Sequence, residues 1–392
     1  MTSNKVQGDE MHILEMPSFF APHGGLFCLD QAKALQARGH EVRVLSCSQL
    51  GLTTDNAFYF SSRRGRWWED MDGIECYRTY MHGMPRIVRY NIWRWVSIVR
   101  SMYEDYKKRY GKPDVLHVHC AKWGGVAARL IAKEEKIPYF VTEHISCGLY
   151  EADFGKGWTK HEWVKALIRT VWEDAACVIP VAEEMVEDLK PFFGTSYRYH
   201  TISNIIDTEF YSYREREPIA GRKFRFCILA RGDIFGKGYD VLAKAYKHIA
   251  GCELHIAGIA TDTEEMRGLF AGCEGVIIHG RLDKYGVRDL LYHCDALVLP
   301  SRSEVQPLVV LEAMATGIPF IGTEAIPVSE RVSGACTIVP VANSDVLRDA
   351  MKKMADITEP TSRQAYSETM KKIASYDIVG KQLEKLFIDE AK

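Results

Sequence analysis

Two glutamates, Glu304 and Glu312, stand out in the segment LVLPSRSEVQPLVVLEAMATGIPF, residues 297–320. Its apolar start predicts a strand, a polar loop then carries Glu304, and Glu312 lies one turn inside a predicted helix. Carboxylates do not bind phosphate, but they accept hydrogen bonds from paired hydroxyls such as those of a sugar. An E-x7-E pattern alone is weak evidence for a site. The alternative, a surface loop followed by an ordinary helix with both glutamates solvated, has equal weight.

The predicted helix begins next to a proline. Pro307 is expected at the first helical position, which suits its fixed φ and its missing N–H group. The helix runs through LVVLEAMAT and is expected to stop at Gly317. Free N–H groups at Leu308 and Val309, together with the helix dipole, would make an anion site at the carboxyl end of the strand. A diphosphate flanked by sugar and ribose hydroxyls would fit this segment.

A second segment, LARGDIFGKGYD at residues 229–240, offers two cations on one loop. A strand is expected to end at Ala230, and a glycine-rich loop then presents Arg231 and Lys237. A guanidinium and an ammonium on one loop can neutralise a pyrophosphate and the charge that develops as it leaves. The segment is not a P-loop, because no Ser or Thr follows Lys237 and the leading glycine is absent. A solvent-facing loop with two incidental cations is the alternative.

A glycine pair follows the first predicted strand. In the sequence APHGG, Gly24 and Gly25 would let backbone N–H groups approach a phosphate or a sugar closely. The segment is not G-x-G-x-x-G, and no acidic residue closes the second strand as a dinucleotide site requires. An NAD-dependent dehydrogenase is therefore disfavoured. A plain strand-to-helix turn is the alternative.

Three histidines are candidates for chemistry. His117 and His119 alternate within DVLHVH and are therefore expected on the same face of one strand. A metal site would need further ligands, and the sequence suggests none, so no metal is expected. His144, in VTEHIS, follows another strand and is expected to face a cleft; a structural histidine is the alternative.

An aromatic and basic stretch covers residues 63–110, with eleven Lys and Arg against six Asp and Glu. Within it, residues 86–102 could form an amphipathic helix that mixes arginines with tryptophans, as interfacial helices do. Peripheral membrane contact through residues 63–102 is one interpretation. An ordinary helix with solvated arginines and inward-packed tryptophans is slightly favoured over it.

Alternating strands and helices must position these residues, and this order is typical of parallel α/β sheets. In the first half we expect strands at residues 12–16, 41–46, 115–119, 139–142, 177–181 and 199–202, and a helix at residues 26–38. After a polar, turn-rich linker at residues 203–223, the segments FRFCILA, ELHIAG, VIIH, ALVL and PFIG predict a second parallel sheet. A final amphipathic helix is expected at residues 377–390. Two such domains would form a cleft at the carboxyl ends of their strands.

Bulk properties exclude several classes of protein. With 392 residues, two domains are expected, and a net charge of −2 gives no bias toward nucleic acid or anionic membranes. Eleven scattered cysteines without a C-x-x-C pair favour neither a disulfide framework nor a zinc site. No apolar window is long enough to span a bilayer. The polar residues 1–10 lack an apolar signal core and are expected to be disordered, so a cytoplasmic location follows.

Together these segments resemble glycosyltransferase family 4, whose members have the GT-B fold. The motifs that carry the resemblance occur in the family's usual order and cover nearly the whole chain after Met11: GG, RGHEV, DVLHVH, VTEH, SNIID, ARG…KG and SE-x6-LEAMATGIP. The resemblance implies two Rossmann-like domains facing across a cleft. Residues 11–203 would bind the acceptor, residues 204–374 would bind a nucleotide-sugar donor, and the helix in residues 375–392 would cross back onto the first domain.

The resemblance also implies roles for single residues. Arg231 and Lys237 would bind the diphosphate, Glu304 the hydroxyls of the donor sugar, and Glu312 the ribose. The remaining donor-side positions are backbone or pocket residues: Pro307, Leu308 and Val309 at the phosphate, Gly24 and Gly25 closing over it, and Leu282 and Asp283 near the base. His144 would lie beside the reacting sugar. The catalytic set is thus His144, Glu304, Arg231 and Lys237.

Four departures from the family pattern affect these loops. Arg231 and Lys237 are separated by one residue more than usual, so their loop must bulge. Val305-Gln306-Pro307 replaces the usual glycine-phenylalanine-glycine. Ala260 replaces a customary glycine in HIAGIA, and Ala325-Ile326 replaces glycines that usually approach the donor sugar.

The implied activity is metal-independent, retaining transfer of a hexosyl or N-acetylhexosaminyl group from a UDP- or GDP-sugar, without a cofactor. The acceptor would be a hydroxyl of a glycan or a lipid-linked glycan in surface polysaccharide synthesis, in the cytoplasm or at the inner face of the membrane. The partners would then be a nucleotide sugar and that acceptor, with no nucleic acid. A sugar-nucleotide epimerase on the same fold and a non-catalytic sugar-nucleotide-binding subunit are the alternatives.

Overall fold

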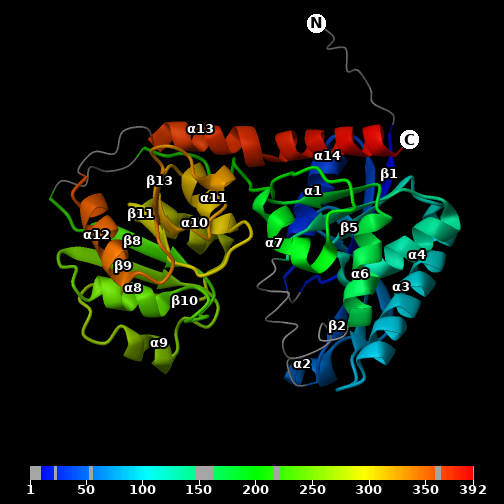
Figure 1. Cartoon of the computed structure of the whole chain (residues 1–392), viewed down its shortest axis with the longest axis horizontal. Coiled ribbons are helices and arrows are strands. Elements are labelled where there is room, and N and C mark those ends of the chain that lie inside the picture. The colour runs from blue at the N-terminus through cyan, green and yellow to red at the C-terminus, as the bar shows by residue number, and fades with distance from the viewer. Residues whose placement is uncertain are drawn as a thin grey trace, which may run out of the picture. The chain divides into compact units, whose positions relative to one another are not determined.

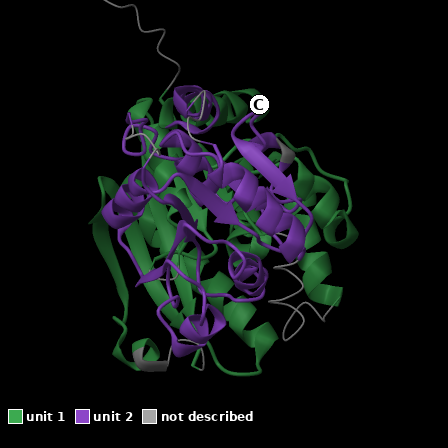
Figure 2. Ribbon diagram, turned by 90° about the vertical axis from the view of Figure 1, so that its left-hand side faces the viewer, with its two compact units in different colours: residues 1–205, 376–392 green, residues 206–375 purple. Residues whose placement is uncertain are grey.

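The computed structural model describes residues 10–21, 24–52, 56–145, 162–215, 221–357 and 363–391. The chain divides into two compact units, shown in different colours in Figure 2. Unit 1 comprises Met1–Ile205 and Tyr376–Lys392, and unit 2 comprises Ile206–Ser375. The predicted disordered extension, residues 1–10, lies outside the described residues except for its last residue.

Unit 1 is built on one seven-stranded sheet in the order β3-β4-β2-β1-β5-β6-β7. Figure 1 labels β1, β2 and β5 of this sheet. Its strands are β1 (His12–Pro17), β2 (Glu41–Leu50), β3 (Arg66–Met71), β4 (Ile74–His82), β5 (Val115–His119), β6 (Tyr139–Glu143) and β7 (Cys177–Pro180). All neighbouring pairs are parallel except β3 and β4. The central strands are buried along nearly their whole length, as expected for a parallel sheet covered on both faces.

Helices flank this sheet, and the last one comes from the C-terminus. They are α1 (Phe27–Ala37), α2 (Asn56–Ser61), α3 (Val88–Tyr110), α4 (Val126–Glu135), α6 (Glu162–Glu173), α7 (Glu184–Phe193), α14 (Tyr376–Glu390) and the short π-helix η1 (Ala121–Gly125). Leu383 and Phe387 of α14 are fully buried in the same core cluster as α1 and β1. Glu384 of α14 accepts hydrogen bonds from Arg38 and contacts His40. The predicted return of the final helix onto the first domain is confirmed.

Unit 2 is built on a six-stranded, all-parallel sheet in the order β10-β9-β8-β11-β12-β13. Its strands are β8 (Phe224–Leu229), β9 (Cys252–Ala257), β10 (Val276–Gly280), β11 (Ala296–Leu299), β12 (Phe320–Thr323) and β13 (Cys336–Val339). Its helices are α8 (Tyr239–Tyr246), α9 (Glu264–Leu269), α10 (Lys284–His293), α11 (Leu308–Ala315), α12 (Ser344–Ala355), α13 (Arg363–Ala374) and the short 3-10 helix η3 (Val328–Glu330).

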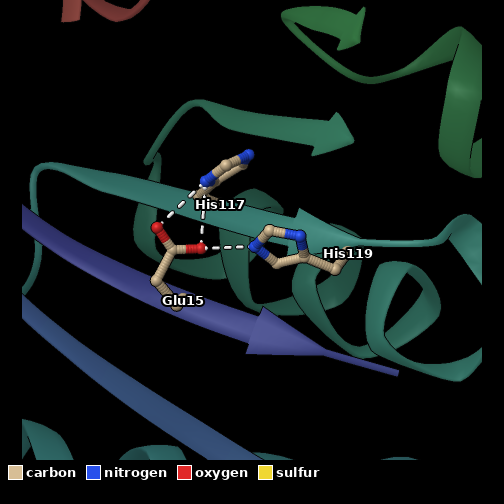
Figure 3. Close-up of side chains that lie close together, drawn as sticks. All are labelled: Glu15, His117 and His119. Atoms are coloured by element: carbon tan, nitrogen blue, oxygen red, sulfur yellow. Dashed lines mark hydrogen bonds and ion pairs between the residues drawn. The ribbon is translucent and has the colours of Figure 1, made fainter. Parts of the chain in front are cut away.

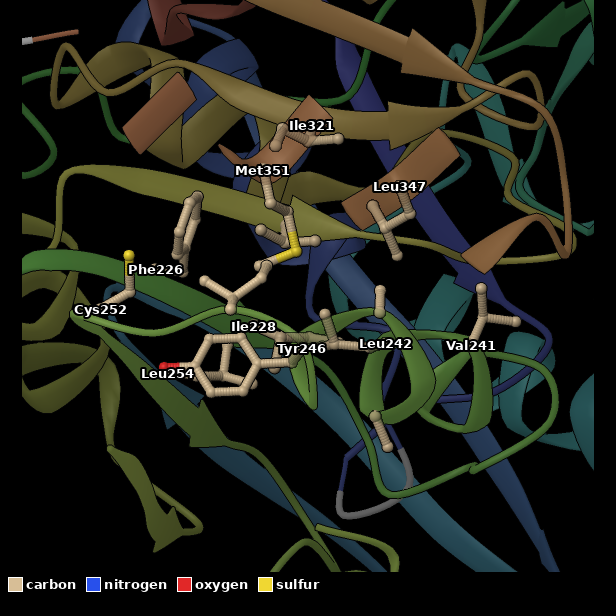
Figure 4. Packing of buried hydrophobic residues seen from close by; sticks show 14 of the residues in the cluster. Phe226, Ile228, Val241, Leu242, Tyr246, Cys252, Leu254, Ile321, Leu347 and Met351 are labelled. Atoms are coloured by element: carbon tan, nitrogen blue, oxygen red, sulfur yellow. The ribbon is translucent and has the colours of Figure 1, made fainter. Parts of the chain in front are cut away.

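Alternate side chains of β8 enter two different cores of unit 2. Phe226 and Ile228 pack with α8 and α12 on one face, where Figure 4 shows them beside Met351. Cys227 and Leu229 pack with α10, α11 and α13 on the other face. Because the sheet is covered on both sides, the loops at the ends of its strands are the places left for a ligand.

The strand orders place a topological switch point in each unit. In unit 1 the chain builds outward from β1 in one direction and from β5 in the other, and in unit 2 it does so from β8 and β11. Ligands of open α/β sheets bind outside the carboxyl ends of the strands at such points. The loops after β1, β5, β8 and β11 are therefore the first places to search.

The structure corrects the sequence-based elements in four places. Residues 199–202 do not form a strand; only an isolated bridge joins Tyr199 to Val178. The hairpin of β3 and β4 and the edge strand β13 were not predicted. Pro307 is the N-cap of α11 and not its first helical residue, because its ψ of 106° is extended.

Candidate active site

The loop after β8 carries two of the predicted cations at the switch point of unit 2. Residues 233–238 fold into a compact turn, in which the Lys237 N–H donates to the Asp233 carbonyl (3.0 Å) and the Gly236 N–H donates to the Asp233 carboxylate (2.9 Å). The Arg231 side chain is exposed and makes no hydrogen bond or ion pair with any residue that the structure describes. The turn accommodates the additional residue between the two cations.

Lys237 and Glu304 are in direct contact. The Lys237 ammonium donates a 2.7 Å hydrogen bond to Oε1 of Glu304, from the loop after β8 to the loop after β11. The Glu304 side chain is 8% exposed and that of Lys237 is 26% exposed. A carboxylate has two oxygens and about four acceptor positions, so Glu304 can still accept hydrogen bonds from hydroxyl groups. The structure thus joins a predicted phosphate ligand to a predicted sugar ligand.

Arg302, which the sequence reasoning did not single out, holds the same two loops together. Its guanidinium donates two hydrogen bonds of 2.8 Å to the Asp240 carboxylate at the start of α8. It also donates to the Phe235 carbonyl and stacks 3.9 Å from the centre of the Phe235 ring. Gly238 allows a second close approach, because at its φ of +72° a Cβ atom would lie 2.0 Å from the Pro300 carbonyl oxygen. Together these contacts fix the backbone on both sides of Lys237.

The N-terminus of α11 follows Glu304 at the same edge of the sheet. Pro307 caps the helix, and the first hydrogen bond of the helix runs from the Val310 N–H to the Pro307 carbonyl (2.9 Å). The N–H groups of Leu308 and Val309 precede that bond and therefore have no acceptor within the helix. Such N–H groups, together with the helix dipole, favour an anion at this end of the helix. The anion site at Leu308 and Val309 stays a prediction.

Glu312 lies inside α11, half-buried, next to a tyrosine from the segment of unit 2 that precedes β8. Burial raises the pKa of Tyr211, and the hydrogen bond of its phenol to Glu312 adds to that effect. The phenol orients the carboxylate, which keeps further acceptor positions. Nothing in the sequence pattern pointed to Tyr211.

The two residues predicted near a base pocket have structural contacts. Asp283 is the N-cap of α10, and its side chain accepts the Gly286 N–H at 2.8 Å. Leu282 is partly buried against the core of α10 and α11. Asp283 therefore has a structural role, because it caps the N-terminus of α10.

Ala260, Ala325 and Ile326 stand where the family usually has glycines, and their backbone conformations differ from one another. Ala260 has a φ of +59°, the left-handed conformation that glycine adopts at little cost. Ile326 is fully buried in the core, and the Ala325 N–H lies 3.3 Å from the Thr323 hydroxyl. At position 260 the loop after β9 thus keeps a glycine-like backbone although the residue is alanine.

In unit 1, Gly24 and Gly25 precede α1 with φ values of +100° and +77°. A Cβ on Gly25 would lie 2.3 Å from the Phe19 carbonyl oxygen, so only glycine fits this turn. Pro22 and His23 of the same cluster lie outside the described residues. The turn leads into Phe27, whose ring stacks 3.6 Å from the ring of His144.

His117 and His119 lie on the same face of β5, as predicted, and both contact a buried glutamate of β1 (Figure 3). His119 Nε2 is 2.7 Å from Oε2 of Glu15, and His117 Nδ1 is 3.0 Å from Oε1. Burial would raise the pKa of Glu15, but the two histidines outweigh it and keep this pKa below 4.5. The sequence suggested no further ligand here, because the pairing of β1 with β5 was not predictable from it.

His144 follows β6 and joins this cluster. Its Nε2 is 3.3 Å from Nδ1 of His119. Burial, with a further contribution from His119 and His117, lowers the pKa of His144 well below 6.5. His144 is therefore a neutral imidazole at neutral pH.

The arrangement in unit 2 defines a class of site. A lysine, an exposed arginine and a helix N-terminus supply positive charge at one strand edge, and two oriented carboxylates supply acceptors beside them. A ligand that matches this set carries a phosphate or diphosphate flanked by hydroxyl groups.

Comparison with known proteins identifies the family. The family model described as Glycosyltransferase Family 4 matches residues 25–210, and the model described as Glycosyl transferases group 1 matches residues 224–356. The chain belongs to glycosyltransferase family 4 and is a glycosyltransferase.

Relatives and solved structures agree with this family. A protein of Bacillus subtilis named as a teichuronic acid biosynthesis glycosyltransferase, TuaC, is 26% identical over 335 residues, 80% of each chain. The sucrose-phosphate synthase of Thermosynechococcus elongatus is 16% identical with a TM-score of 0.75, covering 96% of this chain and 98% of that one. HepE of Anabaena, solved with UDP, is 14% identical with a TM-score of 0.71, covering 97% and 100%. These likenesses show the GT-B fold.

Proposed function

We propose that this glycosyltransferase moves a sugar from a UDP- or GDP-sugar to a hydroxyl of a glycan or lipid-linked glycan, with retention at the anomeric carbon. The observation that carries the proposal is the Lys237–Glu304 pair at the switch point between β8 and β11. A nucleotide sugar needs a cation to bind its diphosphate and, within the length of one sugar, a hydrogen-bond acceptor for its sugar hydroxyls. HepE, which has also been solved with UDP-glucose, and TuaC, named for teichuronic acid biosynthesis, support this substrate class.

In the proposed reaction the bond between the anomeric carbon and the phosphate oxygen breaks as the acceptor oxygen bonds to the same carbon. The acceptor hydroxyl gives its proton to the leaving phosphate. Lys237, Arg231 and the N–H groups at the start of α11 stabilise the charge on the nucleoside diphosphate. Glu304 holds the sugar hydroxyls and Glu312 those of the ribose.

Three sources of positive charge in one place are the basis for proposing that no metal ion is needed. Lys237, Arg231 and the dipole of α11 act where a divalent ion acts in other phosphoryl-leaving reactions. Turnover that is unchanged by EDTA is the expected result. Loss of turnover on chelation, restored by a divalent cation, would contradict this part of the proposal.

The Lys237–Glu304 contact allows binding and transfer to be separated. Lys237 must leave Glu304, at least in part, to reach a phosphate. We therefore expect Glu304→Gln to bind free UDP or GDP as tightly as the wild type or more tightly, while transfer from the nucleotide sugar falls by about 100-fold. Lys237→Ala should lose both binding and transfer.

The experiment measures nucleoside diphosphate release from a panel of UDP- and GDP-sugars with glycan acceptors, alongside calorimetry with the free nucleotides. Lys244→Ala and Glu274→Gln are the matched controls. Lys244 is exposed in the last turn of α8, and Glu274 is exposed before β10, at the amino end of the sheet. Transfer at wild-type rates in both Lys237→Ala and Glu304→Gln would overturn the proposal.

An exposed surface on unit 1 supports a lipid-linked acceptor. Six large apolar side chains there are 39–68% exposed: Phe60, Met84, Ile87, Tyr90, Trp93 and Trp163. Four exposed arginines accompany them: Arg63, Arg64, Arg86 and Arg89. We call these ten residues the aromatic–arginine patch. No Asp or Glu occurs between Cys76 and Tyr103.

Contacts show that the patch is one surface. The Tyr59 hydroxyl donates to the Gly83 carbonyl (3.3 Å), which joins α2 to the end of β4, and the Arg89 guanidinium lies 5.9 Å from the centre of the Trp163 ring. Trp95, by contrast, is buried on the opposite face of α3. No helix in the described ranges is both long and apolar enough to cross a membrane. A helix with such a face lies in the plane of a membrane interface.

Flotation with vesicles of phosphatidylcholine and phosphatidylserine tests the patch. Replacing Arg86 and Arg89 by serine should weaken binding by about 2 kcal/mol, roughly 30-fold, at about 1 kcal/mol for each arginine. Serine at Lys352 and Lys353, both exposed on α12, is the control. Equal flotation of the two double variants would contradict a membrane role for this surface.

A further inference from the structure

Imidazole rings and a carboxylate gather on one face of the sheet of unit 2, toward its amino end. Leu254 and Ile256 of β9 pack in the core with α8 and α12. Side chains alternate along a strand, so Glu253 and His255 lie on the opposite face, the one that packs with α10. His293 is the last residue of α10. One ligand atom each of Glu253, His255 and His293 lies within 4.8 Å of the other two.

The distances in this cluster suit ligands of a metal ion. His255 Nε2 lies 3.5 Å from Oε2 of Glu253, which is longer than the roughly 2.7–3.2 Å of an N–H···O hydrogen bond. Two ligands of a tetrahedral zinc ion, each about 2.05 Å from the metal, are about 3.3 Å apart. The His293 ring is exposed and meets the His255 ring edge-on, with 5.1 Å between the ring centres. A rotation of this exposed side chain can bring its nitrogen to the same ion.

A cluster of histidines and a glutamate in unit 1 has the spacing of hydrogen bonds instead. The nitrogens of His117 and His119 lie 2.9 Å and 2.7 Å from the same oxygen of Glu15. Atoms this close share a proton, so no ion fits between them. The cluster in unit 2 is therefore the better candidate for a metal site.

A further ring contacts the other nitrogen of His255. Nδ1 of His255 lies 3.0 Å from Nε2 of His279 on β10, and the two rings stack with 5.2 Å between their centres. One of these nitrogens carries the proton and the other accepts it. When Nδ1 of His255 donates to His279, Nε2 of His255 is a lone pair on the side of Glu253. Metal-binding histidines almost always have such an acceptor for their second nitrogen.

Burial keeps these rings uncharged. Burial, followed by the neighbouring rings, lowers the pKa of His255 to about 4. Glu253 raises this pKa but is the smaller effect. Burial also lowers the pKa of His279 and, with Arg225, that of His293. Only an unprotonated imidazole binds a metal ion, so at neutral pH these rings need not lose a proton first.

Charged neighbours set how tightly such an ion can bind. Arg225 of β8 donates from Nε to Oε2 of Glu253 at 3.3 Å. Arg222 makes a bidentate pair with Asp295, with two hydrogen bonds of 2.7 Å. The arginines balance the carboxylates, and a divalent ion must therefore compete with Arg225 for Glu253. Binding is expected to be reversible for this reason.

We propose that Glu253, His255 and His293 bind a divalent transition-metal ion, for which Zn²⁺ is the best match. His279 is the outer partner of His255. Two imidazoles and a carboxylate, with water in the fourth position, are an established set of zinc ligands. The ion joins the end of α10 to β9 and stabilises unit 2. The loops of the donor site follow the carboxyl ends of β8 and β11, so removal of this ion should leave turnover unchanged.

The test is a titration of metal-free protein with Zn²⁺ in competition with a chromophoric chelator. The wild type should bind Zn²⁺ at this site. His279→Leu should weaken the binding by about 10- to 100-fold, and His293→Gln, which removes a ligand, by more than that. His248→Gln is the matched control, since His248 is exposed after α8 and lies outside the cluster. It should bind Zn²⁺ like the wild type.

Arg225→Gln provides a test with the opposite sign. Removing the positive charge beside Glu253 should tighten Zn²⁺ binding by about 10-fold. Thermal unfolding is the second readout. Excess Zn²⁺ should raise the melting temperature of the wild type and of His248→Gln, and should leave that of His293→Gln unchanged.

A wild type that binds no Zn²⁺, or equal affinity in the wild type and His293→Gln, would overturn the proposal. Unchanged or weaker binding in Arg225→Gln, in protein that keeps the circular-dichroism spectrum of the wild type, would exclude Glu253 from the ligands. The proposal does not rest on the proposed function. A wild type that binds Zn²⁺ but no nucleotide would refute the proposed function alone.

Discussion

Arg302 joins the loop after β11 to the loop after β8, and replacing it by methionine is expected to loosen both. The substitution removes two hydrogen bonds of 2.8 Å to Asp240, one bond to the Phe235 carbonyl and a cation–π contact. The side chain of Arg302 is 17% exposed and that of Asp240 is 28% exposed, so solvent replaces only part of the loss. A partly buried, charge-assisted bidentate pair is worth about 2 kcal/mol.

A loss of this size is measurable in thermal unfolding. Unit 2 spans residues 206–375, and in a domain of this size 1 kcal/mol shifts the melting temperature by roughly 2–4 °C. We expect Arg302→Met to lower the transition of unit 2 by about 4–8 °C. Arg302→Lys should recover only part of this, because an ammonium cannot make the bidentate pair.

The same variant should bind nucleotide less tightly, because Lys237 belongs to one of the two loops that Arg302 connects and contacts Glu304 of the other. The increase in melting temperature with excess UDP should therefore be smaller than in the wild type. Arg348→Met is the control, since Arg348 makes its ion pairs with the exposed Asp345 and Asp349 on α12. A melting temperature and a UDP response like those of the wild type in Arg302→Met would refute this reasoning.

Three further outcomes follow from single contacts. Ala260→Gly should stabilise unit 2 by up to about 1 kcal/mol, because φ of +59° strains alanine; a lower melting temperature would contradict this. Tyr211→Phe should cost about 1 kcal/mol in urea unfolding, because it removes the phenol that bonds to Glu312, and an unchanged midpoint would contradict that bond. The hydrogen bond from Arg302 lowers the pKa of Asp240. Burial raises this pKa but is the smaller effect, so the pKa stays below its ordinary 3.8. A lowered folded-state pKa means that the pair stabilises above pH 3.8 and that this contribution is lost as the pH falls through the folded-state pKa. The difference in stability between wild type and Arg302→Met should therefore be constant from pH 5 to 7 and shrink below pH 4, and a constant difference down to pH 2 would contradict it.

Local patterns in the sequence were sufficient for most strands and for the loops of unit 2. Apolar runs predicted β8 to β12, and the loop residues Lys237 and Glu304 lie where those strands end. The hairpin of β3 and β4 was missed although its turn has a signal. Asp72 and Gly73 both have positive φ, as a two-residue hairpin turn requires, and D-G is its usual sequence.

Contacts between distant strands could not be predicted in the same way. Glu15 and His117 are 102 residues apart and meet only because β1 pairs with β5. The order of parallel strands follows from packing of the whole sheet, and no local pattern encodes it. For the same reason, Tyr211 next to Glu312 became visible only in the structure.

The most direct test of the proposed donor site is a calorimetric titration of UDP and GDP into the wild type, Lys237→Ala and Lys244→Ala. Loss of one charge-assisted contact to phosphate costs about 1.5–3 kcal/mol, so Lys237→Ala should bind the preferred nucleotide roughly 10- to 150-fold more weakly. Lys244→Ala should bind it like the wild type. Equal affinity in all three proteins, or no binding of either nucleotide to the wild type, would contradict a nucleotide-sugar site at Lys237 and Glu304.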